Sequence, residues 1–104
     1  MGENLFPYEL SEEADGDLEE IFDYTVEQYN VEQAIKYLSG FETVFEYLCV
    51  HPESGRKRNE IRDGLRSITN QSHIVFYRIL NERIRIVRVL HSRRDLNKHF
   101  PPKD

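Results

Sequence analysis

The sequence predicts an α+β fold in which a strand and an antiparallel helical hairpin precede a three-strand, mainly antiparallel sheet. Residues 12–51 repeat apolar side chains at helical spacing. Residues 65–91 form three short runs rich in β-branched residues, separated by turn residues. A chain of 104 residues holds one domain with one modest core. We therefore expect the helical hairpin to cover one face of the sheet, in the order β-α-α-β-β-β.

The chain is expected to open with a strand at 6–11, followed by a helix. Pro7 lacks the N–H that a sheet ladder uses, so it fits the start of a strand or a sheet edge. Ser11 is a good helix N-cap, and the acids after it suit a helix N-terminus. From Glu12 to about Tyr29, one stripe recurs at helical spacing. It consists of Ala14, Leu18, Ile21, Phe22, Thr25, Val26 and Tyr29.

A second helix is expected to begin near Val31, after a stop at Asn30, and to end before Pro52 and Gly55. Its apolar positions are Ala34, Ile35, Leu38, Phe41, Val44, Phe45, Leu48 and Cys49. The short link between the helices implies an antiparallel hairpin. Cys49 is the single cysteine of the chain, so no internal disulfide is expected. Its place in the apolar pattern predicts a buried, inert thiol, and a free thiol fits a reducing compartment.

The outer face of the first helix carries acids and no cation. Four pairs of acids stand four residues apart, namely Glu13/Asp17, Asp15/Glu19, Glu19/Asp23 and Asp23/Glu27. Each like-charge pair destabilises an isolated helix by about 0.2–0.5 kcal/mol. We therefore expect this helix to depend on packing against the rest of the domain.

Three strands are predicted in the second half of the chain. They are expected at about 65–69, 73–80 and 83–91. The middle run is apolar on both faces, which is typical of a central strand covered on both sides. In the last run, alternation places Ile84 and Ile86 on one face and Val87 and Val89 on the other.

Polar segments join and follow these strands. The hairpin turns are expected at Asn70-Gln71-Ser72 and at Asn81-Glu82, because asparagine tolerates positive φ. A polar connection with the basic cluster Arg56-Lys57-Arg58 is expected over 53–63. The tail at 92–104 is expected to hold one helical turn over 95–100 before two prolines stop it.

Charge is divided unevenly along the chain. Residues 1–50 contain 13 acids and one Lys or Arg, whereas residues 51–104 contain 6 acids and 13 Lys or Arg. This asymmetry favours large charged partners over a small metabolite. The alternative interpretation is that the two halves neutralise each other within the domain.

Several function classes lack their sequence signals. The chain has no glycine-rich phosphate loop, no nucleophile elbow and no Cys/His zinc spacing. It has no signal-peptide pattern and no apolar run near the ~20 residues that span a bilayer. His91, Asp95 and His99 are spaced by four, but His91 is expected to end a strand, so no metal site is predicted. We expect a cytoplasmic protein with no cofactor, no membrane contact and no small-molecule substrate.

Metal-free RNA cleavage is the enzymatic alternative. It needs a base, an acid and cations that hold the phosphate charge. The candidate cations are Arg62, Arg66, Arg78, Arg93 and Arg94. His91 and His99 are candidates for proton transfer near neutral pH. Nothing in the spacing forces these side chains to converge, and arginines on a sheet commonly pair with helix acids.

Three stretches form a recognisable combination. The first is Leu10-Ser11-x-x-Ala14-x-x-Asp17-Leu18-x-x-Ile21-x-x-Tyr24, and the second is Leu48-x-x-x-Pro52-x-x-Gly55-x-x-Arg58. The third comprises Leu65-Arg66-Ser67, His73-Ile74-Val75-Phe76-Tyr77-Arg78 and Ile86-Val87-Arg88-Val89-Leu90-His91-x-x-Arg94-Asp95. Together they resemble the ParE branch of the RelE/ParE superfamily of bacterial toxins over nearly the whole chain. The sequence departs at Asn30, where relatives usually carry glycine, and this affects only the helix cap.

The resemblance implies a sheet clasped by a helical hairpin and a cognate antitoxin whose disordered segment wraps the toxin. ParE-like relatives act on DNA gyrase and block replication, whereas RelE-like relatives cleave messenger RNA inside the ribosome. The RelE-like sites use Lys or Arg on the sheet with a C-terminal Tyr or His, and Arg66 and Arg78 fall near some of those cations. The matching C-terminal region offers Lys98, His99 and Phe100, and no tyrosine follows Tyr77. This absence favours the gyrase branch.

Two surfaces are expected from these patterns. Target binding is expected at Arg66, Arg78, Arg88, His91, Arg93 and Arg94, where cations could meet acidic protein or nucleic-acid phosphate. The antitoxin segment is expected to fold into a groove between the hairpin and the sheet edge. Its predicted contacts are Glu19, Glu20, Asp23, Tyr37 and Tyr47. Phe41 and Phe45 are expected to pack between the helices, and an antitoxin-binding module without toxicity is a third hypothesis.

Overall fold

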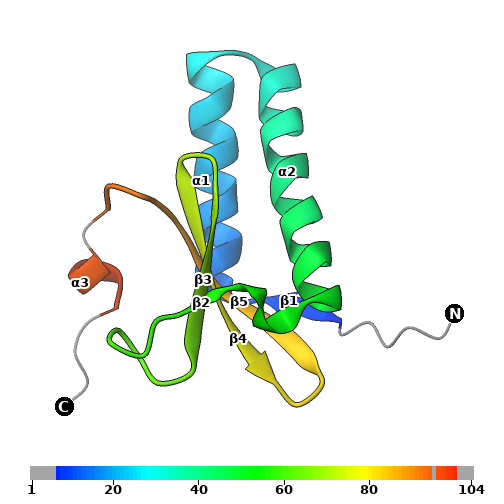
Figure 1. Ribbon diagram of the computed structural model, residues 1–104. Coiled ribbons are helices and arrows are strands. Elements are labelled where there is room, and N and C mark those ends of the chain that lie inside the picture. Colours follow the sequence, from blue (N-terminus) through cyan, green and yellow to red (C-terminus); the bar gives the residue numbers. More distant parts are fainter. Residues whose placement is uncertain (1–6, 95, 101–104) are drawn as a thin grey trace, which may run out of the picture.

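Two long helices pack against one face of a five-strand sheet (Figure 1). The computed structural model describes residues 7–94 and 96–100 of the chain. The elements are β1 (Tyr8–Leu10), α1 (Glu12–Gln28), α2 (Val31–Val50), a 3-10 turn η1 (Pro52–Ser54), β2 (Arg56–Lys57), β3 (Leu65–Asn70), β4 (His73–Leu80), β5 (Arg83–His91) and α3 (Leu96–His99). The predicted α+β fold is confirmed. Phe6, Asp95, Pro101 and Pro102, which also entered the predictions, lie outside the described residues.

The strands follow the order β1-β5-β4-β3-β2. β1 is parallel to β5, and the other neighbouring strands are antiparallel. β4 is therefore central, as its apolar pattern predicts. β2 lies within the segment predicted as a polar connection, where Arg56 pairs with Ser67 and Lys57 with Arg66. Two adjacent charged residues carry no alternating pattern, so this edge strand has no periodic signal in the sequence.

Both long helices begin at side-chain caps. The Ser11 hydroxyl accepts a hydrogen bond from the Ala14 N–H at 2.9 Å, as predicted. Asn30, predicted only as a stop, is also the N-cap of α2, because its side-chain oxygen accepts from the Gln33 N–H at 2.8 Å. With one residue between the C-cap of α1 at Tyr29 and the first residue of α2, the chain turns sharply and forms the expected antiparallel hairpin (Figure 1).

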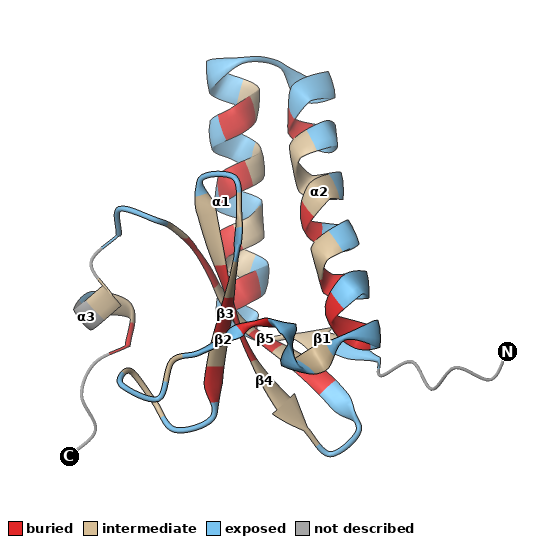
Figure 2. Cartoon of the chain, viewed as in Figure 1, coloured by how far each residue is buried: buried red, intermediate tan, exposed pale blue. Residues whose placement is uncertain are grey.

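The main core lies between the hairpin and the sheet (Figure 2). Its buried members are Ala14, Ile21, Phe41, Phe45, Leu48, Val75, Tyr77, Ile84, Ile86 and Val89. Phe41 and Phe45 are buried as expected, and so is the thiol of Cys49, whose burial raises its pKa. The hydroxyl of the buried Tyr77 forms two hydrogen bonds. It donates to the Pro52 carbonyl at 2.7 Å and accepts from the Gly55 N–H at 2.8 Å.

A smaller core covers the other face of the sheet. It contains Leu65, Phe76, Leu90 and Phe100, with Ile61, Ile74, Val87 and Leu96 packed around them. The short α3 lies on this side, well separated from α2 (Figure 1). The central strand β4 is thus covered on both faces, and the predicted helical turn in the tail is confirmed over Leu96–His99.

A β-bulge changes the predicted faces of β5. Phe76 pairs with Arg88, whereas Tyr77 pairs with Ile86, so Val87 is the extra residue. Val89 therefore joins Ile86 in the main core, while Val87 packs on the opposite face. The prediction that Val87 and Val89 share a face is wrong, because simple alternation does not continue through a bulge.

The hairpin turns lie where they were predicted, but asparagine does not adopt the strained conformation. The positive φ values occur at Gln71, with 56°, and at Glu82, with 55°. Asn70 instead pairs with His73 as the last residue of β3. Short two-residue links and sheet pairing thus impose the backbone geometry against local preference.

Replacing Gly55 tests the packing around Tyr77. A Cβ atom at Gly55 would overlap the Tyr77 hydroxyl, although φ of −75° at Gly55 suits any residue. Gly55→Ala is expected to lower the free energy of unfolding by about 1–3 kcal/mol through overpacking. Urea denaturation followed by circular dichroism measures this change.

Gly16→Ala is the matched control, because no atom outside its own helix backbone lies within 4 Å of the added Cβ. This substitution in α1 is expected to raise stability by about 0.5–1 kcal/mol through helix propensity. Equal effects of the two substitutions would contradict the steric account of Gly55.

Candidate functional site

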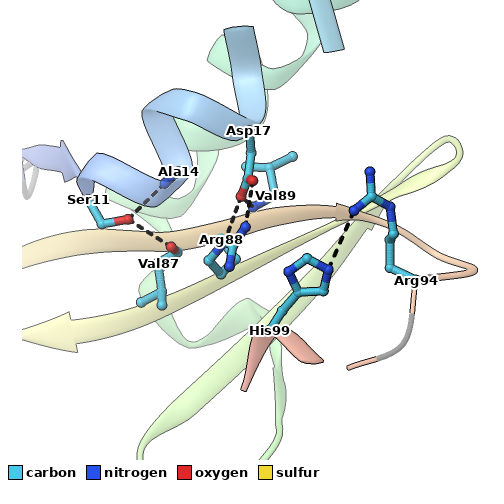
Figure 3. A network of polar contacts seen from close by, with 8 residues as sticks. All are labelled: Ser11, Ala14, Asp17, Val87, Arg88, Val89, Arg94 and His99. Carbon is cyan, nitrogen blue, oxygen red and sulfur yellow. Dashed lines mark hydrogen bonds and ion pairs between the residues drawn. The ribbon is translucent and has the colours of Figure 1, made fainter. Parts of the chain in front are cut away.

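The first turns of α1 cover the edge of β5 beyond the end of β1. The Ser11 N–H donates to the Ile86 carbonyl at 3.0 Å, and the Ser11 hydroxyl donates to the Val87 carbonyl at 2.8 Å. Farther along, the Val89 N–H donates to Oδ2 of Asp17 at 2.9 Å (Figure 3). Side chains of α1 thus satisfy backbone groups that a neighbouring strand would otherwise pair.

Asp17 also binds Arg88 through two hydrogen bonds (Figure 3). Arg88 Nε donates to Oδ2 at 2.9 Å, and Arg88 Nη2 donates to Oδ1 at 2.7 Å. The side chains are only 10% exposed for Asp17 and 18% for Arg88. Hydrogen bonding to the carboxylate raises the pKa of Arg88 above its ordinary value.

This pair corrects two expectations. Asp17 does not lie on the outer acidic face of α1, because its carboxylate is turned onto the sheet edge. Arg88 does not lie on an open basic surface, because its guanidinium is bound by the Asp17 carboxylate of α1. Both residues join the helical hairpin to the sheet.

Other arginines of β5 also pair with acids from the start of the chain. Arg83 Nε lies 3.0 Å from Oε1 of Glu9, and Arg85 Nη1 lies 2.6 Å from Oε2 of the same carboxylate. These contacts lower the pKa of Glu9, mainly through the hydrogen bond from Arg85. Part of the charge asymmetry is therefore neutralised within the domain, which was the alternative interpretation.

Arg66 and Arg78 lie on opposite faces of the sheet. Arg66 pairs with Tyr77 of the main core, whereas Arg78 pairs with Leu65 of the smaller core, and directly paired residues share a face. Arg66 Nη1 donates to the carbonyls of Glu53 at 3.2 Å and Gly55 at 3.0 Å. Arg78 Nη1 donates to the Asp63 carbonyl at 2.9 Å.

The expected basic face that unites Arg66, Arg78 and Arg88 is therefore not formed. Three other predicted target-binding residues, His91, Arg93 and Arg94, come together at the end of β5 with His99, which was predicted only for RNA cleavage, and we call this group the C-terminal basic cluster. It consists of His91, Arg93, Arg94 and His99. Arg93 and Arg94 are exposed, and Arg94 Nη1 lies 3.4 Å from His99 Nε2 (Figure 3). The Arg93 N–H donates to His91 Nδ1 at 3.1 Å.

Among the residues named for RNA cleavage, Arg66 and Arg78 do not assemble with His91 and His99, whereas Arg93 and Arg94 lie beside these histidines. His91 pairs with His73 at the first residue of β4, whereas Arg78 lies near the last residues of that strand. His99 accompanies His91 through Arg94, so the proton-transfer candidates lie far along the sheet from Arg66 and Arg78. Within residues 7–94 and 96–100, no group of three or more His, Cys, Asp or Glu could hold a metal ion.

His73 is a half-buried titratable residue that the sequence analysis did not assign to a site. Its Nδ1 lies 2.7 Å from the Tyr37 hydroxyl, and its ring lies 5.7 Å from Phe41 and 5.3 Å from His91. Burial, followed by the charges of His91 and Arg94, lowers the pKa of His73 from 6.5 to about 4. The packing of α2 on β4 thus favours an uncharged imidazole.

The predicted antitoxin contacts differ in their accessibility. Glu19, Glu20 and Asp23 are exposed along α1, and together with Tyr24, which is 63% exposed, they form what we call the acidic helix surface. Tyr47 is also exposed on α2 and its ring lies 4.8 Å from His51. Tyr37 is half-buried and engaged with His73, so it is not free as an anchor.

The outer end of the hairpin exposes apolar residues that periodicity placed in the buried stripes. Tyr29 is 71% exposed and Ile35 is 56% exposed, with Val31 between them. Both helices extend beyond the sheet at this end (Figure 1), so helical spacing alone overestimates what the sheet covers. In the part of the chain that the structure describes, neither long helix is apolar enough to cross a membrane.

This chain is similar to toxins of type II toxin–antitoxin systems. Residues 8–96 match the family model described as ParE toxin of type II toxin–antitoxin system, parDE. Toxin ParE1 of Caulobacter vibrioides is 37% identical over 94 residues, which cover 90% of this chain and 97% of that protein. Toxin ParE1 of Mycobacterium tuberculosis is 40% identical over 94 residues, covering 89% and 96%. A chain of the chromosomal ParDE TA system from P. aeruginosa superposes with a TM-score of 0.74 at 21% identity, covering 86% of this chain and 98% of that one.

The uncharged state of His73 predicts a pH-dependent stability. In the unfolded chain, His73 titrates near its ordinary pKa of 6.5, but in the fold it titrates at about 4. Between these values the unfolded chain binds more protons, so the free energy of unfolding falls as pH falls from 6.5 to 4. Urea denaturation at closely spaced pH values measures this slope.

His73→Gln is expected to reduce the slope of stability against pH in this window, whatever its effect on stability at neutral pH. His51→Gln is the control, because His51 is exposed. An identical slope in the His73→Gln variant and the unsubstituted chain would contradict this assignment.

Proposed function

The chain belongs to the ParE toxin family of type II toxin–antitoxin systems, and from this membership we propose that it inhibits growth by binding DNA gyrase in the cytoplasm and is neutralised by a cognate antitoxin. The observation that favours binding over catalysis is the separation of the sheet cations Arg66 and Arg78 from each other and from His91, although Arg93 and Arg94 lie beside His91 and His99. Arg66 and Arg78 occupy opposite sheet faces, and His91 lies at the other end of β4. A cleavage site needs base, acid and phosphate-binding cations around one bond.

The C-terminal basic cluster is the proposed target contact. Arg93 and Arg94 are exposed, and among the described residues neither forms an ion pair with an acid. Their guanidinium groups are thus available to a carboxylate or to DNA phosphate near gyrase. Arg83 has equal charge but is paired with Glu9 at the opposite end of β5, which makes it a useful comparison.

Supercoiling by purified gyrase tests this proposal. The unsubstituted chain is expected to inhibit supercoiling and to raise the level of cleavage complexes. Arg93→Gln combined with Arg94→Gln is expected to weaken inhibition by about tenfold or more, since loss of two charge-assisted hydrogen bonds of about 1.5–3 kcal/mol each is at least that large. Arg83→Gln, the matched control, is expected to inhibit normally.

Unchanged supercoiling and cleavage-complex levels with the unsubstituted chain would contradict gyrase as the target. Cuts in ribosome-bound messenger RNA that are abolished by Arg66→Ala or His91→Ala would instead support the nuclease alternative. Growth that continues normally when the chain is expressed alone would support the antitoxin-binding module without toxicity.

For the antitoxin, we propose a segment whose basic residues lie along the acidic helix surface. α1 carries exposed acids with no cation along its outer face, so its field favours a positively charged partner. Tyr24 and Tyr47 are exposed aromatic anchors on the two helices of the same hairpin. An antitoxin that folds on binding could bury these rings while its cations meet the acids.

The triple variant Glu19→Gln, Glu20→Gln and Asp23→Asn, which removes three negative charges, tests the acidic helix surface. Three exposed ion pairs of about 0.2–1 kcal/mol each predict an affinity loss between about threefold and a hundredfold. The salt dependence of binding should weaken at the same time. Glu42→Gln with Glu46→Gln on α2 is the control, and unchanged affinity and salt dependence in the triple variant would contradict the proposal.

A further inference from the structure

The chain's own tail covers an apolar patch on the sheet face away from the long helices. Phe100 is 5% exposed, and its ring centroid lies 5.0 Å from that of Phe76. Leu65 and Leu90 complete the patch beneath it. We call residues 96–100 the tail segment and the residues Leu65, Phe76 and Leu90 the Phe76 surface.

In the part of the chain that the structure describes, the tail segment contacts the sheet through side chains. Among the described residues, no backbone hydrogen bond joins it to a strand, and the Phe100 N–H donates within the segment, to the Leu96 carbonyl at 2.7 Å. Its attachments are the packing of Phe100 and Leu96 and the contact of His99 with Arg94. Release of this segment would therefore break far fewer interactions than unfolding of the sheet. Release would expose the Phe76 surface.

Two arginines frame the same surface. Arg58 Cζ lies 5.7 Å from the centre of the Phe76 ring, and Arg62 Cζ lies 5.4 Å from the centre of the Phe100 ring. Arg58 is paired with Glu60 and also donates to Ser67. Nε of Arg62, in contrast, is buried and has no hydrogen-bond partner within the described residues. A carboxylate beside Phe100 would supply the acceptor that this N–H lacks.

We propose that the Phe76 surface, framed by Arg58 and Arg62, is a docking site for a partner protein segment that carries an aromatic side chain next to a carboxylate, and that the tail segment occupies this site in the free protein. Phe100 provides the template for the aromatic group. The carboxylate next to the aromatic side chain of the partner would accept a hydrogen bond from Arg62 Nε, which has no partner within the described residues. The tail and the partner compete for one surface, and this inference is independent of gyrase as the target.

A peptide competition tests the proposal on the full-length chain. The probe is a fluorescent peptide with the sequence of residues 96–104, and a second probe carries Lys98→Glu. The Phe100→Ala substitution in the protein should leave the Phe76 surface uncovered. The Phe100→Ala protein is therefore expected to bind both probes at least tenfold more tightly than the unsubstituted chain. The Lys98→Glu probe should bind several-fold more tightly than the first, and a probe with Phe100→Ala should not bind.

Two variants of the protein provide controls. Tyr29→Ala removes an exposed aromatic residue at the outer end of the hairpin and should leave probe binding as weak as in the unsubstituted chain. Arg62→Gln, combined with Phe100→Ala, should abolish the preference for the Lys98→Glu probe. Equal probe binding by Phe100→Ala and the unsubstituted chain, or an undiminished preference after Arg62→Gln, would overturn the proposal.

Amide hydrogen exchange on the unsubstituted chain gives a test that does not depend on the folding of a variant. The Phe100 amide is expected to exchange by local release, with little dependence on denaturant, whereas the Phe76 amide in the central strand should exchange only on global unfolding. Exchange of both amides with the same denaturant dependence would overturn a detachable tail segment.

Discussion

The arrangement of this domain depends on one carboxylate at the edge of the sheet. Asp17 accepts hydrogen bonds from the Arg88 guanidinium and from the Val89 backbone N–H, and both partners follow the bulge at Val87. The carboxylate is the acceptor for a backbone N–H of β5 that lies beyond the last residue paired with β1. The helix that carries the most negative charge is thus held to the sheet by its one acid that is turned inwards.

This attachment separates the surfaces on which function would depend. With Asp17 anchored, Glu19, Glu20 and Asp23 remain on the solvent side of α1, and the hairpin extends past the sheet (Figure 2). The C-terminal basic cluster lies at the end of β5, beyond the residues that bind Asp17. An acidic surface for one partner and a basic cluster for another therefore coexist on a small domain. The pairs of Glu9 and Asp17 with arginines neutralise the charge between them.

The sequence was sufficient for the order of elements, the helical hairpin and the burial of Cys49, because each depends on local periodicity. β2 and the positions of Val89 and Arg88 were not predictable in this way, since a two-residue edge strand and a bulge leave no periodic trace. The predicted basic face that would unite Arg66, Arg78 and Arg88 is not formed for a different reason. A two-residue turn at Gln71-Ser72 already places Arg66 opposite Tyr77, and hence on the other face from Arg78. The pairing register of β3 and β4, and not the number of arginines, determines which arginines share a face.

Hydrogen exchange at the Val89 amide tests the role of Asp17 most directly, because the Asp17 carboxylate is the acceptor of this N–H. Comparison of the unsubstituted chain with Asp17→Ala, using the Phe76 amide as internal reference, isolates the sheet edge from global stability. We expect the substitution to accelerate exchange at Val89 by at least about tenfold relative to Phe76, the equivalent of about 1.4 kcal/mol of local protection. Unchanged relative exchange at Val89 would contradict the claim that Asp17 holds α1 to the sheet edge.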